Sequence, residues 1–151
     1  ALRAERGTDR MTGFTKPEQY TLMNLWAMFR SPLMFGGDLP TNDEFTLSLL
    51  TNDEVLAVNQ NSSNNKQLKA ENGQIVWTAD VPGTEDKYVA FFNINDSGTS
   101  EIPVTLAELG ISGNYSVKDL WNKEDKGKVT DKFTVSVEPH ASVLVRFSKL
   151  K

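Results

Sequence analysis

Acidic side chains are the groups in this chain best suited to chemistry, because the sequence contains no cysteine and only one histidine, His140. Without cysteine there is no thiolate nucleophile and no zinc–thiolate site, and one histidine cannot form a cluster of metal ligands. We therefore expect neither a metal ion nor a cofactor. Two carboxyl groups that face each other can divide the roles of acid and base, so neighbouring acidic residues are the candidates that remain.

Two acidic pairs lie in a repeated tetrapeptide. Thr-Asn-Asp-Glu occurs at residues 41–44 and again at 51–54. Thr and Glu three residues apart form the capping box that begins a helix, and negative charge in the first turn is favourable beside the helix dipole. Capping accounts for these carboxylates, and we expect a short helix after each pair, over 45–50 and 55–58.

Asp38 differs from these residues because it follows a predicted strand. Residues 32–35, Pro-Leu-Met-Phe, form an apolar run closed by Gly36 and Gly37, which favours a parallel strand buried on both faces. Because the loops after the strands build the active site of an α/β barrel, Asp38, Gly36 and Gly37 are candidates for lining a ligand pocket. In the structural alternative, Asp38 caps and fixes the loop and the glycines serve the turn. No second carboxylate follows a predicted strand, so we assign no catalytic residue.

A helix is expected before this strand. A capping box over 15–18 predicts that a helix begins there, and the proline at position 32 ends it. Leu22, Trp26 and Phe29 recur at three- and four-residue spacing and form an apolar stripe that needs a partner surface. Helix, strand, Gly-Gly loop and helix is the repeating order of an α/β barrel or a doubly wound sheet. One such repeat cannot form a domain by itself.

The hydrophobic period changes after the polar run 61–65, so we divide the chain into residues 1–60 and 61–151. Short strand-like segments separated by turn residues then follow, which is typical of an antiparallel sandwich. The fold class is therefore mainly β: a C-terminal antiparallel β-sandwich preceded by a helix–strand–helix segment. A single helical turn is expected at 106–109. The predicted strands cover residues 66–71, 74–80, 87–94, 99–105, 114–121, 129–137 and 142–149.

The charge of the chain argues against two classes of partner. A formal net charge of -4 and a pI near 5.0 give no general attraction to nucleic acid or to anionic membrane surfaces. No apolar run reaches the roughly 20 residues that cross a bilayer. We expect no nucleic-acid partner and no membrane partner, and a neutral ligand is easier to accommodate.

Two sequence blocks resemble one known family. Leu-Trp-Ala-Met at 25–28, followed by Ser-Pro-Leu-Met-Phe-Gly-Gly-Asp-Leu at 31–39, is similar to the family-27 glycoside hydrolases, the α-galactosidase family. Leu-Leu-Thr-Asn-Asp-Glu-Val-Leu-Ala-Val-Asn-Gln at 49–60 resembles the segment through which that family leaves its (β/α)8 barrel. The resemblance implies that residues 17–30 are the seventh barrel helix, 32–36 the eighth strand and 42–50 part of the eighth helix.

The resemblance also implies a function for a longer protein. Family members hydrolyse terminal α-galactosides with retention, and their nucleophile and acid/base aspartates follow the fourth and sixth strands, which would precede Ala1. The chain is then a C-terminal fragment that is inactive alone, and an α-galactoside is the carbohydrate partner of the full enzyme. Asp38, Gly36 and Gly37 would line or support the sugar pocket. An extracytoplasmic location is a further implication of the family.

Other functions remain open at this point. The sandwich could be a noncatalytic carbohydrate-binding or interaction module, or it could serve only to stabilise a partner polypeptide. Trp77 and Trp121 could form a sugar-stacking platform, although packing is the stronger interpretation for aromatic residues in strand patterns. Arg10 could reach toward a sugar, although charged loop residues are usually solvated. Because an exposed apolar stripe is rarely tolerated, we expect residues 17–58 to fold back on the sandwich or to be covered by the remaining barrel or a second copy.

Overall fold

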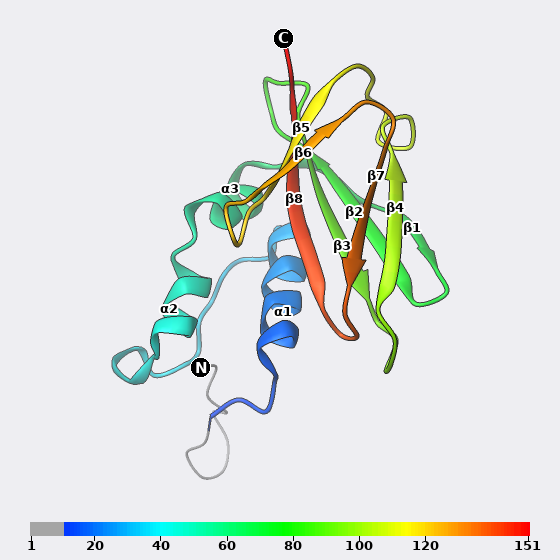
Figure 1. Cartoon of the computed structure of the whole chain (residues 1–151). Coiled ribbons are helices and arrows are strands. Elements are labelled where there is room, and N and C mark those ends of the chain that lie inside the picture. The colour runs from blue at the N-terminus through cyan, green and yellow to red at the C-terminus, as the bar shows by residue number, and fades with distance from the viewer. Residues whose placement is uncertain (1–10) are drawn as a thin grey trace.

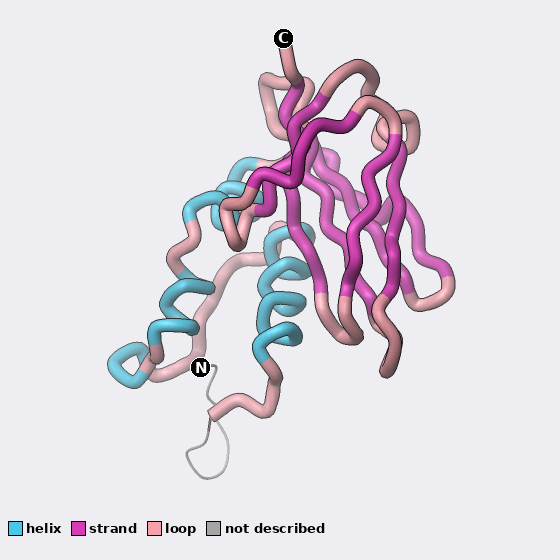
Figure 2. Tube along the Cα trace, in the orientation of Figure 1, coloured by secondary structure: helices cyan, strands magenta, loops and turns pink. Residues whose placement is uncertain are grey.

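The computed structural model describes residues 11–151, in which a helical segment precedes an antiparallel β-sandwich (Figures 1 and 2). The helical elements are α1 (Lys16–Met28), the 3-10 turn η1 (Leu39–Thr41), α2 (Glu44–Leu50) and α3 (Asp53–Asn61). The strands that follow are β1 (Ser63–Glu71), β2 (Gln74–Asp80), β3 (Lys87–Asn93), β4 (Ser100–Thr105), β5 (Tyr115–Asp119), β6 (Asp125–Val129), β7 (Lys132–Val137) and β8 (Ser142–Lys149).

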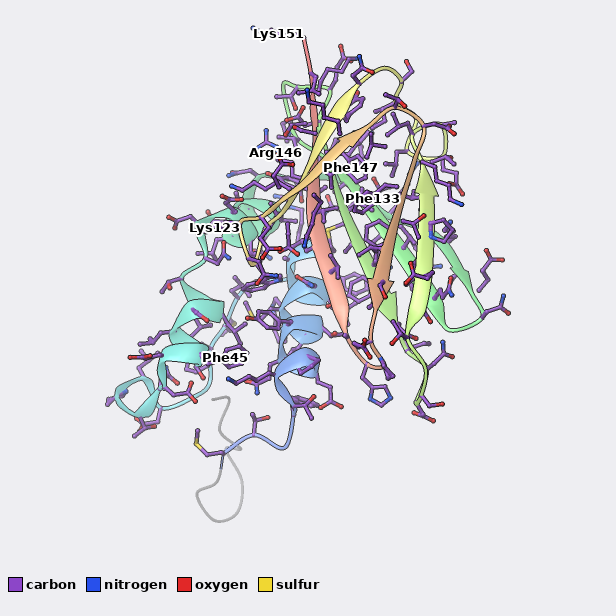
Figure 3. The ribbon with its side chains drawn as sticks, viewed as in Figure 1. Phe45, Lys123, Phe133, Arg146, Phe147 and Lys151 are labelled. Atoms are coloured by element: carbon purple, nitrogen blue, oxygen red, sulfur yellow. The ribbon has the colours of Figure 1, made fainter. Side chains whose placement is uncertain are left out.

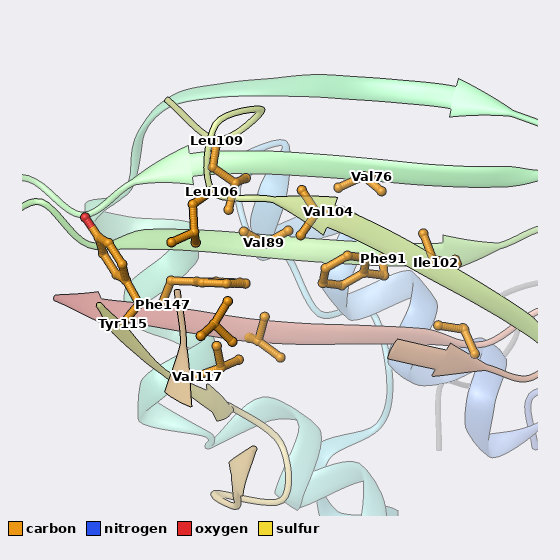
Figure 4. Packing of buried hydrophobic residues seen from close by; sticks show 13 residues of the cluster. Val76, Val89, Phe91, Ile102, Val104, Leu106, Leu109, Tyr115, Val117 and Phe147 are labelled. Atoms are coloured by element: carbon orange, nitrogen blue, oxygen red, sulfur yellow. The ribbon is translucent and has the colours of Figure 1, made fainter. Parts of the chain in front are cut away.

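The strands form two sheets that pack face to face. The larger sheet has six strands in the order β1-β2-β3-β8-β5-β6, and β4 pairs with β7 in a two-stranded sheet. Every pairing is antiparallel. Fully buried side chains such as Phe91, Ile102 and Phe147 fill the space between the sheets (Figure 4). The antiparallel sandwich expected from the sequence is confirmed.

A second core lies on the other face of the larger sheet. Here α1 and α3 pack against the strands, so the molecule has three layers: helices, larger sheet and smaller sheet (Figure 1). Met28 and Val58 from the helices and Ala90 and Leu144 from the strands are fully buried in this core. Burial of these side chains gives the helical segment a partner surface within the same chain. Folding back on the sandwich, one of the expected alternatives for residues 17–58, is therefore observed for α1 and α3.

The ends of the helices correct one detail of the sequence analysis. The capping box at Thr15 and Glu18 is present as predicted. The repeated tetrapeptides cap their helices through a different residue: Asp43 accepts from Thr46 N–H at the start of α2, and Asn52 accepts from backbone N–H groups at the start of α3. An Asp or Asn oxygen caps at least as well as a Thr hydroxyl, so the pattern located the helices and misplaced the capping residue.

Residues 32–35 do not form the expected strand. The segment has no regular secondary structure and no strand partner, and Met34 is 84% exposed. A parallel strand needs neighbouring strands to satisfy its backbone groups and to cover both faces. The strands of this structure pair with one another in the sandwich, so they do not provide those neighbours.

The strand expected over 129–137 is two strands in different sheets. Val129 ends β6 and pairs with Tyr115 of β5, whereas β7 begins at Lys132 and pairs with β4. The four residues before Val129 are exposed, so β6 has no alternating pattern by which the sequence could reveal it. The predicted turn at 106–109 is present, with Leu109 N–H donating to the Thr105 carbonyl oxygen at 3.2 Å.

Candidate functional site

The loop that carries the predicted pocket residues is fixed by its own backbone and by one ring. The exposed Asp38 precedes η1, and its carbonyl oxygen accepts from Thr41 N–H at 3.2 Å and from Thr41 Oγ1 at 3.1 Å. A Cβ at Gly37 would lie 2.4 Å from Cζ of Phe35, so glycine allows the ring to approach. These contacts fix the loop through the Asp38 backbone and the Gly37 position, and the Asp38 side chain makes no cap hydrogen bond to η1. The part played by Asp38, Gly36 and Gly37 in a sugar pocket stays a prediction.

Gly36 also belongs to an apolar hollow of about 330 Å³ on the outer side of the helices. We call this surface the apolar hollow. Met34 and Leu33 are exposed at its edge, at 84% and 37%. Its lining contains no charged side chain, so it suits another apolar surface better than a sugar. The hollow is lined by Leu22, Met23, Trp26, Leu33, Met34, Phe35, Gly36, Leu50, Leu56 and Gln60.

Polar contacts hold the walls of the apolar hollow in place. Trp26 Nε1 donates to the Pro32 carbonyl oxygen at 2.8 Å, which fixes the segment that follows α1 against that helix. Arg30 has a positive φ of 52° and donates to the carbonyl oxygens of Asn59 and Gln60 at the end of α3. Asn59 Nδ2 returns a bond to the Trp26 carbonyl oxygen. These bonds join α1, this segment and α3 into one framework.

The face of α1 that meets the sheet is partly polar. Asn24 is fully buried, and its Nδ2 donates to Ser142 Oγ at 2.8 Å while its Oδ1 accepts from Trp121 Nε1 at 2.8 Å. The predicted stripe lies elsewhere: Leu22 and Trp26 border the apolar hollow, and Phe29 is 55% exposed. Leu22 and Trp26 therefore lie on the surface of α1 that the sandwich leaves open, whereas the Phe29 ring packs against Trp77 of β2.

Trp77 on β2 and Trp121 in the turn after β5 are packed, as the stronger interpretation expected. The Trp121 ring lies 4.9 Å from the Tyr20 ring in an edge-on arrangement, and the Trp77 ring lies 4.5 Å from the Phe29 ring. Both tryptophans pack against the second core. Neither therefore forms a free platform for a sugar. Arg10 lies outside the residues that the structure describes.

Four carboxyl groups have pKa values that oppose a role as general acid. A general acid at neutral pH needs a carboxyl group whose pKa is raised. Within residues 11–151, each carboxyl group with a shifted pKa has it lowered: Glu18 mainly by Thr15 N–H, Asp43 to about 2 mainly by Thr46 N–H, Asp80 mainly by the Asn64 amide, and Glu108 mainly by Thr105 N–H. The same part of the chain holds no group of three or more His, Asp or Glu side chains arranged for a metal ion.

The sequence analysis missed a polar groove at one end of the sandwich. Two adjoining hollows of about 450 and 500 Å³ share Asp80, Lys87 and Gly110, and together we call them the polar groove. Asn64 Nδ2 donates to Asp80 Oδ2 at 2.7 Å, and Lys87 pairs with the other oxygen of Asp80. The only sequence signal was the polar run 61–65, which we interpreted as a domain junction. Pairing of distant strands creates the groove, so no local pattern encodes it.

Comparison with known proteins identifies relatives of this chain. Residues 71–147, about half of the chain, match the model of the alpha galactosidase C-terminal beta sandwich domain. Alpha-galactosidase 2 of Arabidopsis thaliana is 30% identical over 143 residues, which is 92% of this chain and 36% of that protein.

Two solved structures are similar over most of the chain. A family-27 β-L-arabinopyranosidase from Geobacillus stearothermophilus, in complex with arabinose, is 48% identical with a TM-score of 0.91 and covers 97% of this chain and 34% of the other. Alpha-galactosidase I from Mortierella vinacea shares the fold at 24% identity, with a TM-score of 0.83 over 89% of this chain and 36% of the other. The chain therefore spans about a third of the length of the relatives that it matches.

Proposed function

We propose a function from one premise: the chain belongs to the family of the alpha galactosidase C-terminal beta sandwich domain and corresponds to the C-terminal region of a family-27 glycoside hydrolase. The longer protein hydrolyses a terminal α-galactoside or a terminal β-L-arabinopyranoside with retention. These two sugars share the arrangement of their ring hydroxyls and differ in the hydroxymethyl group of galactose. The observation that supports both is the pair of relatives, an α-galactosidase and a β-L-arabinopyranosidase.

The chain contributes a scaffold to this reaction. Retaining hydrolysis requires two carboxyl groups about 5–5.5 Å apart, one as nucleophile and one as acid and then base. The lowered pKa values of Glu18, Asp43, Asp80 and Glu108 oppose the general-acid role for these groups. The chain also spans only about a third of the length of its relatives. We therefore assign the catalytic carboxylates to the remaining part of the enzyme. Asp38 and the two glycines before it would then support the rim of the sugar pocket.

The remaining barrel covers the apolar hollow in this proposal. Leu22 and Trp26 line one wall, Leu33 and Met34 are exposed at the other, and residues 32–35 pair with no strand of the described part of the chain. A neighbouring barrel strand would pair with residues 32–35 and bury both surfaces together. Light scattering of the isolated chain distinguishes the occupants: a concentration-dependent dimer abolished by Met34→Asp would assign the surface to a second copy instead.

Activity of the longer protein tests the proposal. We expect turnover of a nitrophenyl α-galactoside, a nitrophenyl β-L-arabinopyranoside or both, and no turnover by the 151-residue chain. Hydrolysis by this chain alone would refute the assignment of the carboxylates elsewhere. If the longer protein binds these sugars without hydrolysing them, the noncatalytic carbohydrate-binding module becomes the better description. We also keep an extracytoplasmic location as a proposal based on the family, which fractionation of cells producing the longer protein tests.

A further inference from the structure

The polar groove lies between the larger sheet and the turn that follows β4. Asn64 on β1, Thr78 and Asp80 on β2 and Lys87 on β3 line one wall, and Gly110 lies on the turn opposite them. Successive side chains of a strand point to opposite faces, and Trp77 and Ala79 of β2 pack in the core below the helices. Thr78 and Asp80 therefore face away from α1 and from the apolar hollow.

The charges along the groove are largely compensated. Four acidic side chains, Asp80, Glu85, Asp86 and Glu108, and two basic ones, Lys66 and Lys87, line the groove. Lys87 pairs with Asp80, and side chains beyond the lining pair with the other carboxylates: Lys149 with Glu85, Arg146 (labelled in Figure 3) with Asp86 at 2.7 Å, and Lys69 with Glu108 at 3.4 Å. Asn64 adds an amide that donates to Asp80 and leaves its oxygen as an acceptor. The groove thus offers donors and acceptors side by side with little net charge. A multiply charged anion would meet the four carboxylates, and an apolar ligand would leave these polar groups without water.

One side chain in the groove is unexplained by the fold. Thr78 is 4% exposed, and its Oγ1 is buried without a hydrogen-bond partner in the part of the chain that the structure describes. Buried hydroxyl groups are nearly always bonded, because an unpaired one loses the hydrogen bonds that it made with water. Rotation about χ1 can exchange the positions of Oγ1 and the methyl group. A ligand in the groove would then supply the missing partner.

We propose that the polar groove is a binding site for a neutral saccharide. Sugar hydroxyl groups both donate and accept, so they match a wall in which amide, carboxylate, ammonium and hydroxyl groups alternate. Each of the two hollows falls in the size range of small-molecule sites. The proposal does not depend on the proposed function, because the groove lies on the opposite face of the larger sheet from the apolar hollow.

A titration of the isotopically labelled 151-residue chain with D-galactose and, separately, D-glucose tests the site. We expect shifts of the Gly110 backbone amide and the Asn64 side-chain amide, with a Kd on the order of 1 mM for an open polar site. Thr78→Val removes the hydroxyl at nearly constant volume, and Asn64→Ala removes the amide. Each should weaken binding about tenfold or more. Asn122→Ala changes an exposed asparagine outside the groove and should leave the affinity unchanged.

Three results would overturn the saccharide site. The first is a spectrum unchanged by either sugar, and the second is a set of shifts that avoids the groove. The third is Thr78→Val or Asn64→Ala binding as tightly as the Asn122→Ala control, with thermal melting showing that all the variants are folded. Hydrolysis by the longer protein would be unaffected by these outcomes, so failure of the saccharide site and failure of the proposed glycosidase can be told apart.

Discussion

Replacement of Asn24 by alanine tests whether the helical segment and the sandwich are one cooperative unit. Asn24 lies on α1 and is fully buried against the larger sheet. Its amide group connects α1 to the start of β8 and to the turn after β5, because it donates to Ser142 Oγ at 2.8 Å and accepts from Trp121 Nε1 at 2.8 Å. If α1 belongs to the folded unit, the loss of these bonds must lower the free energy of unfolding of the whole chain.

The size of the effect follows from these contacts. Each hydrogen bond contributes about 1 kcal/mol net, and a buried donor left without a partner costs about 1–3 kcal/mol. Ser142 Oγ keeps its contact with Thr21 Oγ1 at 3.0 Å, so only the Trp121 indole N–H is left unpaired. Trp121 is half-buried, and water can satisfy part of its requirement. The expected loss for Asn24→Ala is therefore about 2–4 kcal/mol, including a small cavity.

Urea unfolding followed by tryptophan fluorescence and by far-ultraviolet circular dichroism measures this loss. With a slope of about 2 kcal/mol per molar urea, the midpoint should fall by about 1–2 M and the two signals should remain coincident. Asn122→Ala, an exposed control, should change the midpoint little. A double-mutant cycle of Asn24→Ala with Trp121→Phe should give a coupling of about 1 kcal/mol. A loss no larger than that of the control, or two separate transitions, would refute the single unit.

Three further predictions use other parts of the chain. Met28→Ala, at a fully buried side chain, should cost about 2–5 kcal/mol in urea unfolding, whereas Met34→Ala, at an 84% exposed one, should stay within about 0.5 kcal/mol. Hydrogen bonding to Asp96, and then to Glu18, raises the pKa of His140. The stabilisation by the charged ring is therefore full below about pH 6.5 and is lost as pH rises through the folded pKa. His140→Gln should remove this pH dependence of the melting temperature, measured by thermal melts over that range. Thr46 N–H lowers the pKa of Asp43 to about 2, so this stabilisation is present above 3.8 and is lost as pH falls toward 2, and Asp43→Asn should reduce that acid sensitivity.

Local patterns predicted the elements whose identity is decided locally. β2 and β8 have the predicted limits, because turn residues bracket each of them and their apolar positions fit a sandwich. The capping box at Thr15 located α1 for the same reason. The sequence also indicated that Gly36, Gly37 and Asp38 form a loop, whereas the function of this loop depends on what lies opposite it. The pattern could not reveal β6, whose exposed residues are held by pairing with β5.

The polar groove was beyond prediction for a related reason. Asn64, Thr78 and Lys87 lie on three different strands, and antiparallel pairing places them on one face. The sequence contained no signal for that register, because a shift of one residue would turn each side chain to the opposite face. That Thr78 Oγ1 has no hydrogen-bond partner can be recognised only from the three-dimensional positions of the neighbouring donors and acceptors.

The segment 32–35 shows why an accurate sequence pattern can give an incorrect element. Its apolar run is that of a strand buried on both faces, yet Met34 is exposed, and Met34 N–H donates to the Pro32 carbonyl oxygen at 3.0 Å instead of to a neighbouring strand. Because a strand is defined by its partners, the pattern describes an environment in which partners exist. Hydrogen exchange provides the comparison: amides 33–35 should exchange rapidly in the 151-residue chain and be protected in the longer protein, while those of α1 should be protected in both. Equal, rapid exchange in both proteins would show that no barrel strand pairs with this segment.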